Sequence, residues 1–373
     1  MNQTRNWLDW ARQAGWNPAR DFGPRLVAVL AGAVIFSHPV LGAESGPIRI
    51  GLTCPFTGGS APMGESLRNA VRLAVEEINW KGGLLGRPIE LLERDDEANP
   101  DKGRAHAQEL IDKAKVVATI GSCNTGVVLK TLDLYQNAKI PLLVPVATGV
   151  AITTTYAKAP EHYIFRTSAN DEIQAQLVAR EAVERRRFRK VALLHDTTAY
   201  GEQGKNFLLA ELVKYGVKPV SVSAFPLGVP DLTADLDKAR KAGAEVILTY
   251  TVGPELAVIA NSRAKLGWKA PLIGSWPLSW TNFLSVAKGN AEGASMPQTF
   301  IEEPVNSRRT EFIVTYLGKN NLTRISSAVS AAQGYDTMLL LAAAIRQAGS
   351  TAGPKIRAAL ENLEERGPGV GTT

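Results

Sequence analysis

The feature that most constrains the fold is a repeated alternation of short apolar runs with amphipathic segments. The run 48–52 is apolar apart from Arg49, and the segment 65–80 after it places apolar residues three and four positions apart, which is typical of a helix with one buried face. Further strands are predicted at 89–93, 116–120, 141–144, 191–194, 217–224, 246–249 and 271–274, with helices between them. Strands rich in Val, Ile and Leu that alternate with helices predict an α/β fold of mostly parallel sheets, covered by helices on both faces.

The alternation runs through two successive series, which predicts two α/β units. A chain of 373 residues, 45% of them hydrophobic, is long enough to give each unit its own core. After the second series come three more predicted helices, at 307–319, 326–348 and 355–363. The second of these is apolar on nearly every side, so we expect it to be buried.

The charge of the chain does not point to nucleic acid as a partner, because the formal net charge is only +6. One dense basic run, Arg185-Arg186-Arg187 with Arg189 and Lys190, follows a predicted helix and precedes a strand. Two interpretations of this run stay open. It is either the solvated end of a helix or a patch that binds a partner or an anion.

The first 43 residues have the pattern of a signal peptide with an unusually long n-region. An uncharged apolar run at 26–36 follows Arg20 and Arg25, and small residues that suit cleavage lie at 40–43. The run is too short to cross a bilayer by itself. A buried core helix is the alternative.

The loops after the predicted strands are the place to look for a ligand, because open parallel sheets bind ligands outside the carboxyl ends of their strands. These loops are rich in hydroxyl and amide groups, and they lie at 53–64, 121–126, 145–150, 195–201, 251–254 and 274–280. Hydroxyls and free N–H groups at helix N-termini suit a carboxylate. The alternative for any single Ser or Thr is that it caps its own helix.

Motifs of enzymes are missing from the sequence. It has no GxSxG, GxxxxGK[ST], GxGxxG or HExxH pattern, and its four histidines are scattered. The acidic run Asp95-Asp96-Glu97 offers ligands for a hard cation, but a capped loop before the next helix explains it as well. We therefore expect no catalytic residue, no metal and no organic cofactor.

Several of these segments, in this order, resemble one known family. The chain is similar to the type I periplasmic solute-binding proteins of ABC transporters for branched-chain and hydrophobic amino acids, the group of the leucine/isoleucine/valine-binding proteins. The resemblance runs from about residue 48 to 371 and rests on Gly58 to Gly64, INWKGGLLGRPIEL, RDDEANP, GSCNT, IPLLVPVAT, YIFRTSANDEIQ, DTTAYGEQG and GYDTMLLLAAAI.

The resemblance implies a two-lobed clamshell. Lobe one would comprise residues 44–166 and 297–366, and lobe two residues 167–296. Family members continue through a third crossing into a final piece of lobe two, and this sequence stops there, so we expect that piece to be missing. The implied function is that of an exported, periplasmic and monomeric protein, which closes on a small solute and delivers it to a membrane permease. A ligand-sensing regulator or receptor on the same fold, for an amide or an amino acid, is the alternative.

The resemblance also implies a set of ligand-binding residues. Thr125 and Thr148 would bind the carboxylate of the ligand, with help from main-chain N–H groups of their loops. The remaining expected members are Ser122, Asn124, the carbonyl near Val146, Tyr200, and a lobe-one wall of Phe56, Ser60 and Met63. Cys54 and Cys123 would follow neighbouring strands, where they form either a disulfide or two buried thiols.

Two positions depart from the amino-acid binders. Trp276 occupies the place where these proteins often carry an acid that pairs with the ligand ammonium, and Val252 replaces an aromatic residue. A buried ammonium without a carboxylate is costly, whereas Trp276 and Trp280 offer flat apolar surface. The sequence thus favours an acid with an apolar or aromatic body. An aliphatic amino acid would need another acid, Glu255 or Asp196, to meet its ammonium.

Overall fold

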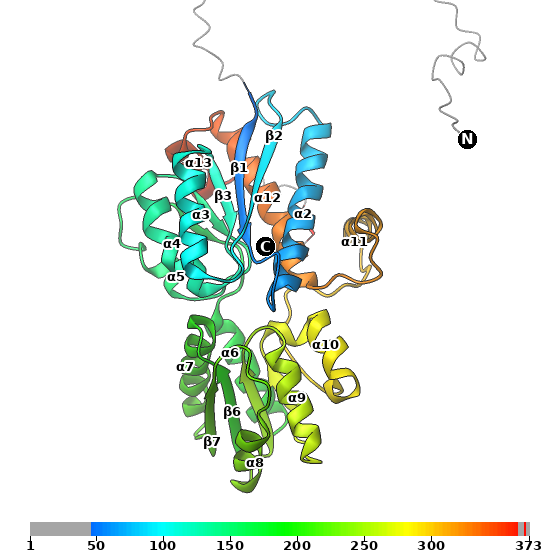
Figure 1. Ribbon diagram of the computed structural model, residues 1–373. Coiled ribbons are helices and arrows are strands. Elements are labelled where there is room, and N and C mark those ends of the chain that lie inside the picture. The colour runs from blue at the N-terminus through cyan, green and yellow to red at the C-terminus, as the bar shows by residue number, and fades with distance from the viewer. Residues whose placement is uncertain (1–45, 365–368, 371–373) are drawn as a thin grey trace, which may run out of the picture. The chain divides into compact units, whose positions relative to one another are not determined.

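The computed structural model describes residues 46–364 together with residues 369 and 370 (Figure 1). A first sheet of parallel strands has the order β2-β1-β3-β4-β5. Its strands are β1 (Ile48–Cys54), β2 (Ile89–Asp95), β3 (Ala118–Gly121), β4 (Leu142–Val144) and β5 (Ile164–Arg166). The apolar pattern predicts four of them and does not single out β5, which has three residues and is only partly buried.

Helices cover both faces of this sheet. One face packs against α2 (Ala61–Trp80) and α12 (Ala328–Ala348), and the other against α3 (Pro100–Asp112) and α4 (Thr125–Ala138). Leu143 of β4 points into the first core, and its neighbours Leu142 and Val144 point into the second. This alternation follows from the pleat of a strand, which turns successive side chains to opposite faces.

A second parallel sheet has the order β7-β6-β8-β9. Its strands are β6 (Val191–Asp196), β7 (Ser221–Phe225), β8 (Val246–Tyr250) and β9 (Leu272–Gly274). One of its faces packs against α6 (Asp171–Ala179) and α7 (Ala199–Lys214), and the other against α8 (Thr233–Lys241), α9 (Glu255–Lys265) and α10 (Thr281–Ala287). Two sheets covered on both faces confirm the α/β fold that the sequence predicts.

The remaining helices return to the first sheet. They are α11 (Ser307–Asn320), α12 and α13 (Gly353–Glu361), while α5 (Ala151–Thr154) is a single turn after β4. Among the described helices, α12 alone is long and apolar enough to cross a membrane, but 78% of its most apolar stretch is buried inside the protein. It is therefore a core helix, as the all-round apolar pattern predicts.

Besides β5, some helical elements differ from the sequence prediction. The helix expected at 171–184 is regular only as far as Ala179, and residues Arg180–Arg185 form a π-helical turn, η1. This wider turn carries Arg186 back onto Glu181, where the Arg186 amide donates to the Glu181 carbonyl at 3.0 Å. Another difference is α10, a helix that the sequence pattern does not predict. Only Phe283 and Ala287 of its seven residues are buried, too few for a period to be recognised.

The strand order places a crevice at the same position in both sheets. In the first sheet β1 lies between β2 and β3, and in the second sheet β6 lies between β7 and β8. The chain therefore adds the next strand on one side of β1 or β6 and the following strand on the other side. At such a switch point the loops after the two central strands diverge and leave space for a ligand. The loops after β1 and β3, and those after β6 and β8, are thus the structural candidates for a site.

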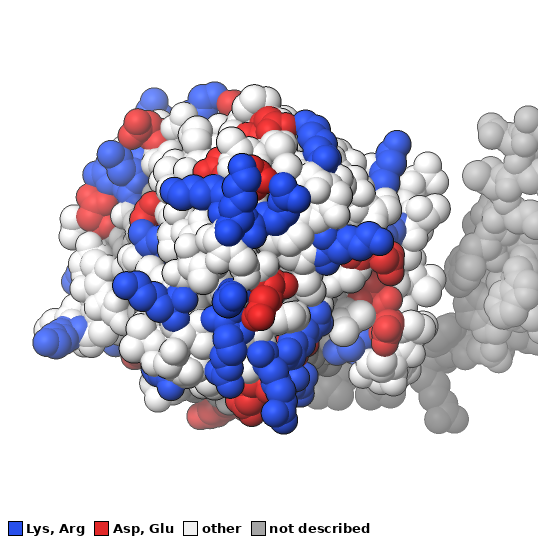
Figure 2. Space-filling view, turned by 90° about the horizontal axis from the view of Figure 1, so that it is seen from below, with Lys and Arg blue, Asp and Glu red and all other residues white. Residues whose placement is uncertain are grey.

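Figure 2 shows the face of the second sheet's unit that lies away from these strand ends. Lys and Arg side chains are spread over this face, with Asp and Glu between them. Ion pairs such as Lys265 with Asp231 and Arg240 with Asp237 join the two signs of charge. The positive net charge of the chain is therefore not gathered into a continuous basic track in this view.

Candidate functional site

A small cavity lies at the carboxyl ends of both sheets. The space inside it is about 30 Å³, which suffices for one or two water molecules. No charged side chain lines it within the part of the chain that the structure describes. Its lining consists of Met63, Cys123, Asn124, Thr125, Val146, Ala147, Thr148, Tyr200, Val252, Trp276, Pro277, Trp280 and Ser330.

The wall from the first sheet carries two hydroxyls that lack partners. Thr125 begins α4 and is 1% exposed, and Thr148 follows β4 and is 3% exposed. Neither hydroxyl has a hydrogen-bond partner within the described residues. A buried hydroxyl without a partner costs about 1–3 kcal/mol, so two of them in one cavity indicate that a polar group of a ligand completes the site.

The first turn of α4 adds main-chain donors. Its cap residue, Asn124, makes no side-chain hydrogen bond to the first turn, and that turn contains no acidic residue. The N-terminus of a 14-residue helix thus meets the cavity without a capping acceptor. The partial positive charge of this end favours an anion, and a carboxylate there would also meet the Thr125 hydroxyl.

A disulfide fixes the loops that carry this wall. Cys54, at the end of β1, and Cys123, after β3, are joined, with their Cα atoms 5.2 Å apart. Beside it, the hydroxyls of Thr53 and Ser122 are hydrogen-bonded at 2.8 Å. Both loops are thereby held at the switch point of the first sheet.

Three predicted site residues lie outside the cavity lining. Ser122 is occupied with Thr53, and Ser60 accepts a long hydrogen bond of 3.4 Å from the side chain of Asn124. Phe56 lies beneath the guanidinium of Arg68, 4.6 Å from the ring centre. The structure places these side chains behind the wall or beside it, where they support the loops.

The wall from the second sheet is aromatic and apolar. Tyr200 of α7, Val252 after β8, and Trp276, Pro277 and Trp280 after β9 form it. Trp276 is 6% exposed, and its main chain is fixed from two directions. Its amide faces the side-chain oxygen of Gln174 at 3.4 Å, and its carbonyl accepts from the side-chain amide of Gln298 at 3.3 Å.

The two acids that could meet a ligand ammonium have other partners. The Asp196 carboxylate is fully buried and accepts from the hydroxyls of Thr198 and Thr251, at 2.5 and 2.7 Å, and from the Val252 amide. Glu255 accepts from the Gly228 amide at 2.7 Å. Neither side chain lines the cavity, so its second-sheet wall presents no carboxylate.

A third acid, Asp171, lies behind Thr148 at the start of α6. Its Oδ1 accepts a hydrogen bond of 2.6 Å from the Tyr250 hydroxyl, while Oδ2 has no partner within the described residues. Burial raises the pKa of Asp171 to about 6, although Thr148, Tyr250 and Arg166 nearby limit the rise. The Tyr250 ring in turn packs 4.7 Å from that of Tyr200, which connects Asp171 to the cavity wall.

The loop 57–60 and the second-sheet elements touch at one edge of the site. The side-chain amide of Asn282 in α10 donates to the Gly59 carbonyl at 3.0 Å. A Cβ on Gly59 would lie 2.8 Å from Cδ of Pro254, so glycine is required for this close approach. The described conformation therefore brings both walls into contact over the cavity.

The acidic run Asp95-Asp96-Glu97 serves as a capped loop. Asp95 accepts from the Phe56 amide and the Thr57 hydroxyl, and Asp96 from the Ala98 amide. Asn99 then caps α3 by accepting from the amides of residues 101 and 102. Asp95 and one oxygen of Asp96 bind donors of the chain itself, and Glu97 pairs with Lys102 at 2.6 Å, which favours the capped loop over a cation site.

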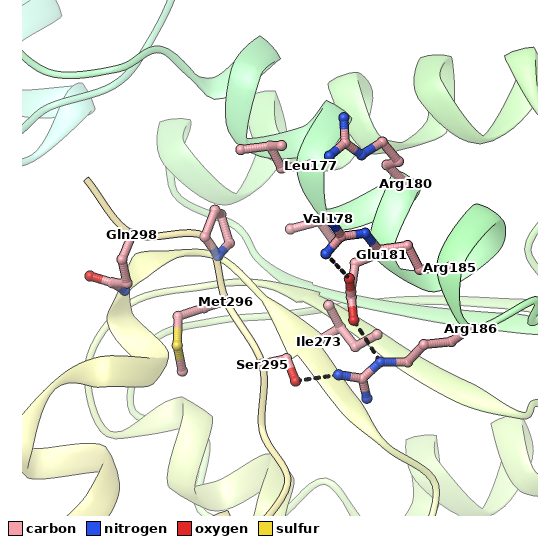
Figure 3. Close-up of a pocket in the computed structure, with 11 residues that line it drawn as sticks. Leu177, Val178, Arg180, Glu181, Arg185, Arg186, Ile273, Ser295, Met296 and Gln298 are labelled. Atoms are coloured by element: carbon pink, nitrogen blue, oxygen red, sulfur yellow. Dashed lines mark hydrogen bonds and ion pairs between the residues drawn. The ribbon is translucent and has the colours of Figure 1, made fainter. Parts of the chain in front are cut away.

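A second hollow, of about 360 Å³, lies away from the strand ends, between α6, η1 and the segment 295–298 (Figure 3). It contains part of the basic run. Figure 3 shows the guanidinium groups of Arg185 and Arg186 turned toward Glu181, and Arg186 also donates to the Ser295 hydroxyl at 2.7 Å. These pairings favour the solvated helix end over an anion patch for the basic run.

Five lining residues are not among the predicted ligand-binding residues: Cys123, which was expected only as a possible disulfide partner, and Ala147, Pro277, Trp280 and Ser330. Ala147 lies between two predicted members of the loop after β4, and Trp280 was singled out only as apolar surface. Ser330 belongs to α12, far along the sequence from any strand end. No strand-end rule can reveal such a residue, because it reaches the cavity only through the packing of α12 on the first sheet.

A crevice built by two α/β units, with polar donors on one wall and apolar rings on the other, defines a binding protein for small solutes. The family described as periplasmic binding protein matches residues 47–373, and the chain belongs to it. The family that the sequence resembles is thereby confirmed. Members of the family are solute-binding proteins and are periplasmic, whereas the predicted signal peptide lies outside the described residues.

Individual relatives agree with this assignment. The chain is 28% identical over 305 residues to a Leu/Ile/Val-binding protein homolog of Brucella melitensis, covering 82% of this chain and 80% of the relative. A periplasmic binding protein type 1 from Bordetella pertussis has 28% identity and a TM-score of 0.78, covering 87% and 90%. An R. palustris solute-binding protein of an ABC transporter, solved with benzoate, has 22% identity and a TM-score of 0.75, covering 84% and 85%, and shares the fold.

Proposed function

We propose that this chain is the periplasmic component of an ABC transporter that captures a small carboxylic acid with a flat apolar body. The observation that carries the proposal is that the two walls of the cavity differ in polarity. Two unpartnered hydroxyls and an uncapped helix N-terminus lie on one wall, and aromatic rings without a charged group lie on the other.

The carboxylate would bind to the wall of the first sheet. The hydroxyls of Thr125 and Thr148 can each donate one hydrogen bond to it, and the first turn of α4 supplies main-chain N–H groups. Hydrogen bonds to a charged acceptor are worth about 1.5–3 kcal/mol each. Both threonines come from loops at the same end of the first sheet, so the donors to the carboxylate are gathered on one wall.

The body of the solute would lie against Trp276, Trp280 and Val252. An amino acid would bring an ammonium to this wall, and Asp196 and Glu255 are occupied by other donors. The relative solved with benzoate supports an aromatic acid. The relatives named for leucine, isoleucine and valine make a branched-chain amino acid the second candidate.

Capture would proceed by closure of two lobes, at residues 44–166 with 297–366 and at 167–296. The cavity of about 30 Å³ is too small for either kind of solute, so the walls must part before one enters. A solute that touches both walls binds the closed form better and shifts the population toward it. Residues 1–43 would direct export, and a membrane permease would receive the solute from the closed form.

The test is a thermal-shift screen of the mature chain, from Glu44 onward, with matched pairs of solutes. Leucine is compared with 4-methylpentanoate, and phenylalanine with 3-phenylpropanoate, since each pair differs only by the ammonium group. Benzoate is tested beside benzamide, which lacks the charge. A ligand at 100 times its Kd stabilises a protein by about 2.7 kcal/mol.

We expect the three acids to stabilise the chain and their partners to have little effect. Stabilisation by leucine and not by 4-methylpentanoate would replace the proposal with the branched-chain amino acid. Equal stabilisation by benzoate and benzamide would refute the carboxylate site on the first wall.

A further inference from the structure

The binding site as proposed does not use Asp171, a fully buried acid beside its first wall. Asp171 is 0% exposed and lies directly behind Thr148, whose carbonyl accepts from the Asp171 amide at 3.0 Å. The Thr148 side chain lies near enough to the Asp171 carboxyl group to lower its pKa, although neither the Thr148 hydroxyl nor Asp171 Oδ2 forms a hydrogen bond of regular geometry within the described residues. The Asp171 carboxyl group, in which Oδ1 accepts from Tyr250 and Oδ2 is open to a proton, thus lies beside a hydroxyl that faces the solute.

The charged and titratable groups around Asp171 come from four elements. Tyr250 of β8 donates to its Oδ1 at 2.6 Å, and Tyr200 of α7 packs against Tyr250. Arg166 of β5 is the nearest cation, but its guanidinium donates to the carbonyls of Thr148 and Gly149 and not to the carboxylate. Asp196, at the end of β6, also acts on Tyr200 and adds a second negative charge to the surroundings.

Arg166 therefore compensates the Asp171 charge only from a distance. Glu172, the exposed neighbour of Asp171 on α6, also interacts electrostatically with Arg166. Burial raises the pKa of Asp171 to about 6. A solute carboxylate bound at Thr148 would be a further negative charge in the same buried place, and like charges disfavour ionisation.

The Thr148 hydroxyl has only one proton to donate, so the protonation state of Asp171 decides whether that proton is available to the solute. A hydroxyl has one proton to donate and two lone pairs. When Asp171 is ionised, it competes for that proton, and Thr148 would then turn lone pairs toward the solute carboxylate. When Asp171 is protonated, its own O–H donates to Thr148, and the Thr148 proton is free for the solute.

We propose that the solute carboxylate is bound together with one proton, which Asp171 takes from solvent and holds on Oδ2 behind Thr148. This inference rests on the proposed function, because it concerns the same carboxylate. Asp171 is then a positioning residue that acts on the solute through Thr148. Asp171 also makes the affinity for the solute depend on pH, an effect that the two threonine hydroxyls alone would not produce.

The expected dependence follows from linkage. Above a pH of about 6 the free protein must take up a proton in order to bind, so Kd rises with pH by up to about tenfold per pH unit. Below that pH, Asp171 is already protonated and Kd levels off. Benzoate serves as the probe, because carboxyl groups exposed to water titrate well below this range.

The experiment is isothermal titration calorimetry of benzoate binding at pH 7 in two buffers of different ionisation enthalpy. The difference in observed enthalpy counts the protons, and we expect a value close to one for the natural chain. In Asp171→Asn, the amide can donate permanently to Thr148 while its oxygen still accepts from Tyr250. We expect no proton uptake, a Kd that is flat from pH 5.5 to 8, and about tenfold tighter binding at pH 7.

Tyr250→Phe is the second variant, since it removes the donor to Oδ1. It should raise the pKa of Asp171 further and move the bend in the Kd profile to higher pH. Glu302→Gln is the matched control. Burial raises the pKa of Glu302 as well, but its carboxylate accepts from the Ile325 amide and does not line the cavity. This control should keep the proton uptake of the natural chain.

Each outcome decides the question. Binding of benzoate with no proton uptake, or weaker binding by Asp171→Asn at pH 7, overturns the role of Asp171 and leaves the carboxylate site standing. Loss of proton uptake in Glu302→Gln assigns the proton to a group other than Asp171. Failure of benzoate and of every other acid in the panel to bind at any pH overturns the proposed function, and this inference with it.

Discussion

Replacing Thr125 by valine should stabilise the protein and weaken its ligand binding at the same time. The hydroxyl is buried without a partner, and the methyl that replaces it has nearly the same shape. Removing an unsatisfied buried hydroxyl recovers part of its desolvation penalty, so we expect the free energy of unfolding to rise by about 1 kcal/mol. The lost hydrogen bond to a carboxylate is worth about 1.5–3 kcal/mol, which corresponds to a Kd roughly 10- to 100-fold higher.

The matched control lies on the same helix. Thr131 is also buried in α4, but its hydroxyl donates to the Val128 carbonyl at 2.9 Å. Thr131→Val should therefore lower the free energy of unfolding slightly and leave Kd unchanged. Urea unfolding without ligand gives the first quantity, and calorimetry with the best acid from the thermal-shift screen gives the second.

The test is strict because the two variants are expected to change the free energy of unfolding in opposite directions. A Thr125→Val variant that loses stability as Thr131→Val does would show that the hydroxyl has a partner when no solute is present. A variant with unchanged Kd would show that the carboxylate binds elsewhere. Either result would refute the link drawn between the unpartnered hydroxyls and the solute.

Three further changes have defined outcomes. Trp276→Glu places a carboxylate on the apolar wall, so leucine affinity should rise and 4-methylpentanoate affinity fall by tenfold or more in calorimetry. Asp96→Asn removes an acid whose pKa burial raises to about 6. Since this acid ionises near 4 when unfolded, the natural chain is destabilised as pH rises from about 4 to 6, and the variant should be more stable by up to about 3 kcal/mol at pH 7, with no difference at pH 4. Replacing Cys54 and Cys123, 69 residues apart, by alanine should lower the free energy of unfolding by about 4 kcal/mol in urea titrations.

Much of the fold could be predicted from the sequence, because burial on both faces leaves a strong periodic signal. The strands β6 and β8 are buried throughout, β1 is buried at every position but Arg49, and α12 is apolar on nearly every side. The π-helical turn after α6 could not be predicted, since Ala182 and Val183 remain buried whether the turn is regular or wide. Its geometry depends on the pairing of Arg186 with Glu181, which the hydrophobic pattern does not record.

The site could be predicted as far as the strand-end rule reaches. Thr125 and Thr148 follow parallel strands of one sheet, so topology alone brings them to the same edge. Whether Cys54 and Cys123 pair stays open in the sequence, and the structure joins them. The placement of Ser330 and Asp171 depends on how helices pack against the sheets, and neither position has a local pattern that reveals it.

The carboxylate donors and the apolar rings lie on different walls of the site. This separation has a consequence for the order in which a solute meets the two walls and for the evolution of the site. In the proposed function, the hydroxyls and the α4 N-terminus that would bind the carboxylate belong to the first sheet and its helices, so the open protein already presents these donors to a solute. Different acids should then associate at similar rates and differ mainly in how slowly they leave, since the second sheet acts only after docking. Changes confined to the loops after β8 and β9 can thus redirect the protein to a new acid without rebuilding its anchor.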